Sequence, residues 1–410
     1  MKDDIVVGLD IGTTKVCAVI GEVKENNQIN IISLGLSDSH GLRKKIVVNL
    51  ESTTKSIGKA IDEAQLMAGV DVGSVYAGIA GGHIKSMNSH GVIAVNSQGN
   101  EISESDVERV IDAAKALSIP MDREVIHVIP QDFIIDGQAG IKDPIGMSGV
   151  RLEAVVHIVT GAVTSAQNIV KSVNRAGYAV DDIVLEPLAA SYAVLNDDEK
   201  ELGVMLLDIG GGTADIAIFN EGSIWHTEVV SLGGENITRD ISVGLRTPMA
   251  EAEKIKIKYG AAIASMVSED EIIEIPNVGG LKSRTLSRHI LCEIIEPRIT
   301  EIFELVKGVV KKTGYDELIA GGVVLTGGTA NMQGITELGE KILEKPVRIG
   351  VPKNVGGLVD VINNPMYSAG VGLVFYGTKN MEKGRTVRFS GGDLFRNITN
   401  RMKEWFGEIF

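Results

Sequence analysis

Two segments rich in glycine and threonine carry aspartates in positions where a phosphate group and its metal ion could be bound. They are Gly8–Ile20 and Leu206–Phe219, and both contain the pattern Asp-Ile-Gly. Glycine tolerates positive φ and has no Cβ, so such a turn can point several backbone N–H groups at one phosphate. Asp10 and Asp208 stand where each segment enters its turn, and Asp215 is a candidate third carboxylate. These three aspartates are predicted to hold Mg²⁺, mainly through water, because this ion keeps much of its hydration shell.

The surrounding residues predict the elements that hold these turns. In each segment, apolar and β-branched runs flank the glycines, which predicts a strand, a tight turn and a second strand, and the repetition indicates an internal duplication. A third glycine-rich turn, Val323–Gln333, follows a predicted strand, opens a predicted helix and suits the edge of a nucleoside. Two helices rich in small residues, Glu186–Leu195 and Tyr367–Val374, can cross closely, as a hinge between moving domains requires.

Any one of these turns alone would more often be a structural β-turn, but the five elements in this order resemble the superfamily of actin, sugar kinases and heat-shock chaperone ATPases. The resemblance implies duplicated ribonuclease H-like cores in two domains, with ATP and Mg²⁺ between them. The phosphates would meet both hairpins, and the adenosine would meet the third turn. The implied nucleotide-binding residues are Gly234 and, in these turns, Gly12, Thr13, Thr14, Lys15, Gly210, Gly211, Gly212, Thr213, Gly327 and Gly328.

Other residues in this set have two interpretations each. By the resemblance, Glu186 and Asp208 are the catalytic candidates, and Glu186 would help to place Mg²⁺ and the attacking water. Glu186 could equally be a carboxylate that satisfies the start of its own helix. Glu253 and Lys256 match an adenosine-facing pair of the chaperones, or they form an ordinary solvated pair three residues apart on a helix.

The middle of the first half predicts a strand, a helix capped by Ser103 and Asp106, and further strands. This insertion resembles the IC subdomain of the FtsA family, the bacterial cell-division homologues of actin, in which IC replaces the usual IB subdomain. The likeness is carried by Ile126–Gln131, Pro144–Glu153 and Glu186–Ser191, and it extends over nearly the whole chain.

The expected fold class is therefore α/β, an actin-like two-domain ATPase fold with an FtsA-type IC insertion and a C-terminal amphipathic helix. The expected divisions are 1–84 with 162–197 and 364–378 for subdomain IA, 85–161 for IC, 198–236 with 303–363 for IIA, 237–302 for IIB, 379–392 for a flexible linker and 393–410 for the terminal helix.

The last segment has the pattern of a helix that lies in a membrane surface. At ~100° per residue, its apolar side chains share one arc, cations border that arc and acids lie opposite. The predicted membrane-binding residues are Leu394, Phe395, Ile398, Arg401, Met402, Lys403, Trp405, Phe406, Ile409 and Phe410. From Lys379 onward, seven Lys and Arg face four Asp and Glu, which favours anionic lipid. The alternative is a helix that packs on its own domain or in a partner's groove.

The bulk composition limits the partners and the compartment. The net charge of −14 argues against nucleic acid as a partner. Two distant cysteines, no secretory pattern at the N-terminus and no apolar run of ~20 residues predict a cytoplasmic body without a transmembrane segment.

By resemblance, the protein binds ATP, polymerises like actin, and anchors the tail of FtsZ to the inner face of the cytoplasmic membrane at the division site, with at most slow ATP hydrolysis. Arg284, Arg288 and Arg298 of IIB would meet the C-terminal tail of FtsZ, or they are ordinary solvated helix charges. Other division proteins would bind through IC.

Three rivals remain: a sugar-type kinase or true ATPase, a chaperone, and an actin-like scaffold of the rod-shape or pilus-assembly kind. No residue suggests a sugar pocket or catalytic base, and few residues follow Gly377 for a chaperone's substrate domain. The pairing of this insertion with a terminal amphipathic helix disfavours the other scaffolds.

Overall fold

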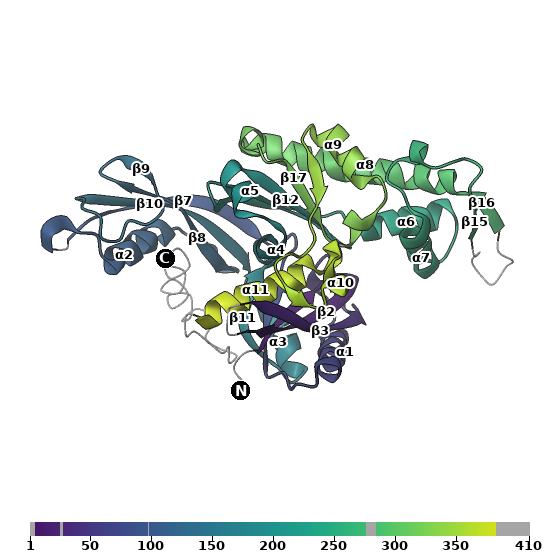
Figure 1. The fold of residues 1–410 in the computed structure, drawn as a ribbon, viewed down its shortest axis with the longest axis horizontal. Coiled ribbons are helices and arrows are strands. Elements are labelled where there is room, and N and C mark those ends of the chain that lie inside the picture. Colours follow the sequence, from purple (N-terminus) through teal and green to yellow (C-terminus); the bar gives the residue numbers. More distant parts are fainter. Residues whose placement is uncertain (1–4, 25–27, 97, 276–283, 383–410) are drawn as a thin grey trace.

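Three sheets dominate the computed structural model, which describes residues 5–24, 28–96, 98–275 and 284–382 (Figure 1). The first sheet has the order β11-β6-β1-β2-β3-β19, and the second has the order β14-β13-β12-β17-β18. The first is built from Ala179–Leu185, Ser74–Ile79, Ile5–Ile11, Lys15–Val23, Ile29–Asp38 and Gly356–Gly357. The second is built from Ser223–Val230, Ala214–Asn220, Val204–Ile209, Val323–Thr326 and Val347–Ile349.

The two sheets share one topology, as the predicted duplication requires. Each sheet contains an antiparallel hairpin, formed by β1 with β2 in the first sheet and by β12 with β13 in the second. On the other side of the hairpin's first strand lies a parallel strand, which is β6 in the first sheet and β17 in the second. The hairpin strands are rich in Val, Ile and Leu and are buried along almost their whole length, because helices cover the sheets.

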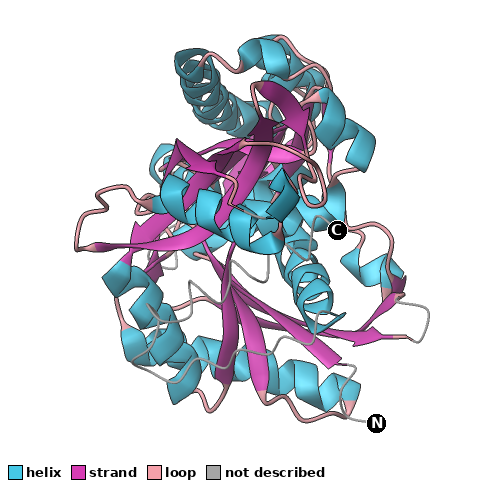
Figure 2. Cartoon of the chain, turned by 90° about the vertical axis from the view of Figure 1, so that its left-hand side faces the viewer, coloured by secondary structure: helices cyan, strands magenta, loops and turns pink. Residues whose placement is uncertain are grey.

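Helices cover both faces of the first sheet (Figure 2). Helices α1 (Leu50–Ala68) and α3 (Val163–Arg175) pack on one side, and α11 (Ser368–Glu382) packs on β1, β2 and β6 from the other. The short helix α4 (Glu186–Val194) contacts α11 and also β12 and β13 of the second sheet. It therefore lies between the two domains.

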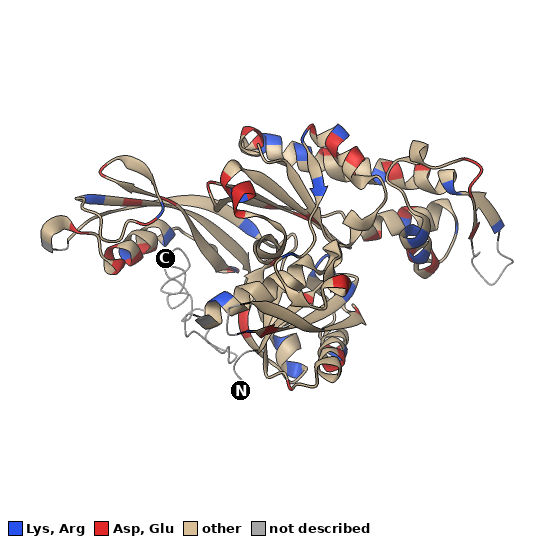
Figure 3. Cartoon of the chain, in the orientation of Figure 1, with Lys and Arg blue, Asp and Glu red and all other residues tan. Residues whose placement is uncertain are grey.

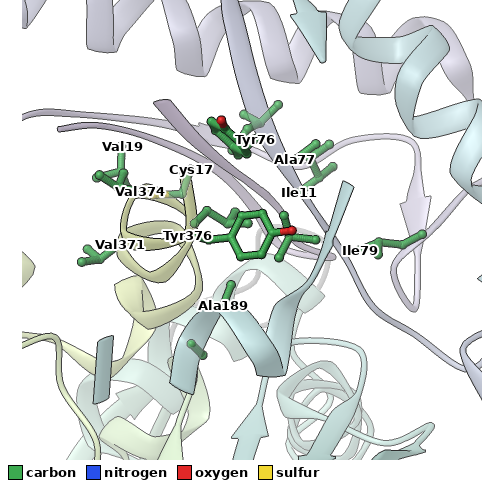
Figure 4. Close-up of a cluster of buried hydrophobic side chains, with 14 of the residues drawn as sticks. Ile11, Cys17, Val19, Tyr76, Ala77, Ile79, Ala189, Val371, Val374 and Tyr376 are labelled. Atoms are coloured by element: carbon green, nitrogen blue, oxygen red, sulfur yellow. The ribbon is translucent and has the colours of Figure 1, made fainter. Parts of the chain in front are cut away.

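The predicted close crossing of the two small-residue helices is confirmed. A Cβ added to Gly372 in α11 would lie 2.0 Å from the carbonyl oxygen of Ala189 in α4, so only glycine permits this approach. Figure 4 shows Val371, Val374 and Tyr376 of α11 among buried side chains of the first sheet.

The second domain carries α8 (Arg288–Thr313) and α9 (Ile335–Leu343), which pack against each other beside the second sheet. Helices α5 (Asp197–Leu202), α6 (Gly234–Gly244) and α7 (Met249–Tyr259) and the hairpin of β15 (Ile272–Ile275) with β16 (Arg284–Ser287) complete it. Helix α8 is continuous across the boundary expected between IIB and IIA, and α11 reaches Glu382, into the segment expected as a linker. The third glycine turn opens a single 3-10 turn, Gly328–Asn331, and α9 begins only at Ile335.

The insertion is the third sheet, with the order β7-β10-β8-β9. Its strands are Lys85–Ala94, Arg151–Ala162, Arg123–Ile135 and Gln138–Ile141, and α2 (Glu104–Lys115) packs on β7 and β10. The predicted cap of α2 is present, with the Ser103 backbone N–H donating to Asp106. Strands β7, β8 and β10 also contact β14 of the second domain.

Acidic and basic residues are interspersed along the helices (Figure 3). The described part of the chain thus presents charge of both signs on the same elements.

Candidate functional site

The first hairpin places its turn at the junction of the two domains. Strand β1 ends one residue after Asp10, and the turn closes with Gly12 N donating to Lys15 O at 3.0 Å. The Thr13 hydroxyl accepts a hydrogen bond from Lys45 N at 3.1 Å. The Lys15 side chain turns toward the segment before α11, where its Nζ donates to the Met366 carbonyl at 2.7 Å. It remains close enough to Asp10 to interact with it electrostatically.

The second hairpin repeats this turn. Gly210 N donates to Thr213 O at 2.9 Å, and Asp208 pairs directly with Asp215 across the antiparallel strands. The Thr213 hydroxyl donates to Asp215 Oδ2 at 3.0 Å.

The two turns touch each other across the junction. A Cβ added to Gly211 would lie 2.5 Å from Thr14 Cγ2, and one added to Gly212 would lie 2.6 Å from Thr13 Oγ1. Glycine is needed here because any side chain would push the hairpins apart.

A loop before α6 and the third glycine turn close against the second hairpin. Gly234 N donates to Gly210 O at 2.9 Å, and the Thr329 hydroxyl donates to the same oxygen at 3.3 Å. Gly327 has φ +85°, and a Cβ there would lie 2.2 Å from Asp208 Oδ1. Beside it, Gly328 faces open space, since a Cβ there would meet nothing within 4 Å. The structure thus brings together the predicted residues of all three turns, and Gly234 with them.

Glu253 and Lys256 form an ion pair at 2.7 Å, but they are not an ordinary solvated pair. The Lys256 side chain is only 10% exposed, and its Nζ donates to the Gly234 carbonyl at 3.0 Å and to the Thr238 hydroxyl at 2.9 Å. The pair therefore fixes α7 to the glycine that starts α6, at the edge of the cluster of turns.

Four buried carboxylates, from Asp10, Glu186, Asp208 and Asp215, gather below the turns. Burial raises the pKa of Glu186 to about 8 and that of Asp208 to about 6, and it also raises the pKa of Asp10. Glu186 Oε1 and Asp215 Oδ1 are buried without a hydrogen-bond partner in the described structure. Two unpartnered carboxylate oxygens in one acidic site fit a bound cation.

The site also contains a residue that the sequence did not suggest. Lys45, from the turn between β4 (Leu42–Arg43) and β5 (Ile46–Val47), forms ion pairs with Glu186 and with Asp215, the latter at 3.1 Å. Burial by itself would lower the pKa of Lys45, but Asp215 and Glu186 together hold it well above its ordinary value. Its partners are far away in sequence, so no local pattern could have identified it.

The residues present fit a magnesium nucleotide. Gly328 of the third turn faces open space, and the carboxylates would hold Mg²⁺, with Asp10, Asp208 and Asp215 as the predicted set. Within the described residues, no three His, Cys, Asp or Glu side chains are placed to bind a metal ion directly. Binding through water, as expected for Mg²⁺, therefore stays a prediction.

The three arginines predicted to meet a partner peptide already have intramolecular partners. Arg288 forms an ion pair with Glu271 at 3.1 Å, and Arg298 forms one with Asp240 at 2.6 Å. Arg284 donates instead to the backbone carbonyl of Leu245.

The predicted membrane-binding residues between Leu394 and Phe410 lie outside the described part of the chain. Among the helices that are described, each is too short or too polar to cross a bilayer.

Comparison with known families supports the whole-chain resemblance. A family model described as "Cell division protein FtsA" matches residues 205–372, and one described as "SHS2 domain inserted in FTSA" matches residues 81–160. The chain is 51% identical over 406 residues to the cell division protein FtsA of Pseudomonas aeruginosa, covering 98% of this chain and 97% of that one. It is 41% identical over 414 residues to FtsA of Escherichia coli K12, covering 98% of each chain.

Solved structures show the same fold at low identity. A chain of the PilM-PilN type IV pilus biogenesis complex superposes with a TM-score of 0.67 at 15% identity, covering 92% of this chain and 99% of that one. MreB5 of Spiroplasma citri bound to ADP superposes with a TM-score of 0.56 at 14% identity, covering 94% and 100%. The expected actin-like fold with an inserted domain is thereby confirmed.

Proposed function

The chain belongs to the FtsA family of cell division proteins, and we propose that it acts as an actin-like, ATP-binding tether of the bacterial division ring. Family membership gives it a role in cell division. In the proposal it binds ATP with Mg²⁺ between its two domains, polymerises, and holds the C-terminal tail of FtsZ at the inner face of the cytoplasmic membrane. It also helps to recruit later division proteins.

The convergence of three glycine turns on one acidic site carries the nucleotide part of the proposal. Backbone N–H groups at such turns suit phosphate oxygens, and glycine lets the phosphates approach the chain closely. Glu186 starts α4, and α4 contacts both sheets. The binding of a ligand to this carboxylate would therefore depend on the relative position of the two domains. Mg²⁺, when bound, would neutralise phosphate charge beside these carboxylates.

The residues of the chain have separate tasks in this site. Gly12, Thr13 and Thr14 would bind phosphate from one hairpin, and Gly210 to Thr213 would bind it from the other. The third turn, with Gly234, Glu253 and Lys256, would form the wall beside the adenosine. Glu186 and Asp208 are the candidates for directing a water molecule at the last phosphate.

For the FtsZ tail, the contacts favour Arg284 among the three candidate arginines. A peptide carboxylate at Arg288 or Arg298 would compete with the acidic side chain that each arginine already pairs with. At Arg284, the carboxylate would replace only a hydrogen bond to a backbone carbonyl. The membrane contact of residues 393–410 and the recruitment of partners by the insertion are supported by sequence resemblance alone.

A titration with a fluorescent ATP analogue tests the nucleotide site. We expect Asp208→Ala to weaken binding about 10- to 100-fold, as removal of a metal-site carboxylate does. Asp198→Ala, which removes an exposed aspartate of α5, is the matched control and should leave binding unchanged. Equal affinity of the two variants would show that the nucleotide binds elsewhere.

A vesicle experiment tests the tether. FtsZ should sediment with anionic vesicles only when this protein is also present, and ATP should increase the amount if filaments array many terminal helices. FtsZ that stays in the supernatant in the complete mixture would contradict the proposal.

A further inference from the structure

Lys45 is placed inside the acidic site by an unusual turn. Lys44 and Lys45 both have positive φ, at 50° and 62°, in a tight turn where glycine or asparagine is usual. Each such residue costs about 1 kcal/mol or more relative to an ordinary conformation. Because Lys45 N donates to the Thr13 hydroxyl, the turn is fixed against the first phosphate hairpin.

The Lys45 ammonium joins the two domains through the acidic cluster. One partner, Glu186, starts α4 beside the first sheet, and the other, Asp215, lies on β13 of the second. The lysine side chain is 6% exposed. A buried ammonium is tolerated only when carboxylates compensate for its lost hydration, so this pairing is an essential part of the site.

The same two carboxylates each keep one oxygen unused. Lys45 contacts Glu186 Oε2 and Asp215 Oδ2, while Glu186 Oε1 and Asp215 Oδ1 have no partner in the described structure. The ammonium therefore neutralises part of the negative charge and leaves oxygens available to a second cation. Lys15, which also lies near the acidic cluster, is held by the Met366 carbonyl.

We propose that Lys45 is an internal counter-cation of the nucleotide site, which lets the protein bind ATP with less dependence on Mg²⁺ than its four buried carboxylates would otherwise impose. The inference rests on the proposed ATP site. Without Lys45, the phosphates would approach a strongly negative cluster and would need Mg²⁺ to screen it. When Lys45 is present, its ammonium neutralises part of the negative charge of the carboxylates, so less Mg²⁺ is needed. Lys45 acts as a positioning residue, through its ion pairs with Glu186 and Asp215.

The test compares nucleotide affinity with and without Mg²⁺. In Lys45→Met the unbranched stem is retained and the charge is lost. We expect its affinity for the fluorescent ATP analogue to fall about tenfold or more in EDTA, equal to ~1.4 kcal/mol, and by less than about threefold in saturating Mg²⁺. Lys44→Met removes the same charge from the same turn but from a half-buried side chain outside the ion pairs, and it should match the wild type in both conditions.

A second variant covers the case in which Lys45→Met does not fold. At pH 9, above the pKa of about 8 of Glu186, Glu186→Gln removes one negative charge while Lys45 keeps Asp215. The affinity of this variant in EDTA should therefore rise relative to its affinity in Mg²⁺, which is the opposite of the change expected for Lys45→Met. Circular dichroism of each variant shows whether it is folded.

The outcomes separate the two proposals. If the wild type binds the analogue but the ratio of affinities with and without Mg²⁺ is the same in wild type, Lys45→Met and Glu186→Gln, the counter-cation inference is wrong and the ATP site stands. If the wild type binds no nucleotide in either condition, the proposed function itself fails.

Discussion

Acidification should loosen the contact between the insertion and the second domain, through one histidine. His157 on β10 is almost fully buried, with Nδ1 2.6 Å from Asn88 Oδ1 and Nε2 3.3 Å from the Thr227 hydroxyl on β14. Asn88 directs its amide nitrogen to the Trp225 carbonyl and to the Tyr315 hydroxyl, so its Oδ1 must accept. His157 Nδ1 therefore carries the proton and Nε2 accepts from Thr227.

The magnitude follows from the pKa of this ring. Burial, with a smaller contribution from His226, lowers the pKa of His157 from 6.5 to about 3. Between these values the unfolded chain binds a proton at this histidine that the folded protein does not. The contribution of neutral His157 to the free energy of unfolding is therefore fully present above pH 6.5 and is lost as the pH decreases below 6.5. At ~1.36 kcal/mol per pH unit, the loss between pH 7 and pH 5 is about 2 kcal/mol.

Urea unfolding at pH 7 and pH 5 measures this loss. His157→Gln keeps a hydrogen-bonding group and removes the titration, so its free energy of unfolding should fall about 2 kcal/mol less than that of the wild type over this range. His40→Gln, at an exposed histidine, is the control. Parallel losses in wild type and His157→Gln would refute the assignment, since other titrating groups are common to both proteins.

Two further predictions address the crossing of α4 and α11 and the predicted membrane-binding segment. Gly372→Ala should lower the free energy of unfolding by about 1–3 kcal/mol, because the new Cβ meets the backbone of Ala189. The control, Gly308→Ala in α8, places its Cβ in open space and should be neutral or stabilise the protein by up to about 1 kcal/mol. Equal urea midpoints for the two variants would contradict the close crossing of α4 and α11. Deletion of residues 393–410 should release the protein from anionic vesicles while ATP binding persists, and a truncated protein that still sediments with vesicles would exclude this segment as the anchor.

Local pattern was enough to predict much of the candidate site. Asp10 and Asp208 stand at matching places in two repeated hairpins, and a strand, a glycine turn and a strand is a short-range arrangement that residue order specifies. The small residues of α4 and α11 likewise predicted their crossing, because only helices without bulky side chains approach so closely. The cap at Ser103 needs only the next few residues.

Other features of the site depend on contacts that no local pattern contains. The sequence placed Lys15 at the phosphates, but its Nζ is held by Met366, more than 300 residues away along the chain. It left Glu253 and Lys256 undecided, and only the packing of α7 on α6 shows that Lys256 is buried at Gly234. The sequence left Arg288 and Arg298 either as contacts for a partner peptide or as solvated helix charges, and the fold shows that each has an acidic partner within the chain.

Residue order alone specifies the duplicated core and the three glycine turns, because these depend on short segments, and it specifies the family through likeness over the whole chain. By contrast, the fold of the whole chain is what brings Lys45 into the acidic site and places His157 against the second domain. Both depend on side chains from separate elements meeting at one point, where burial and pairing fix their charge, and neither condition is encoded in any short stretch of the chain.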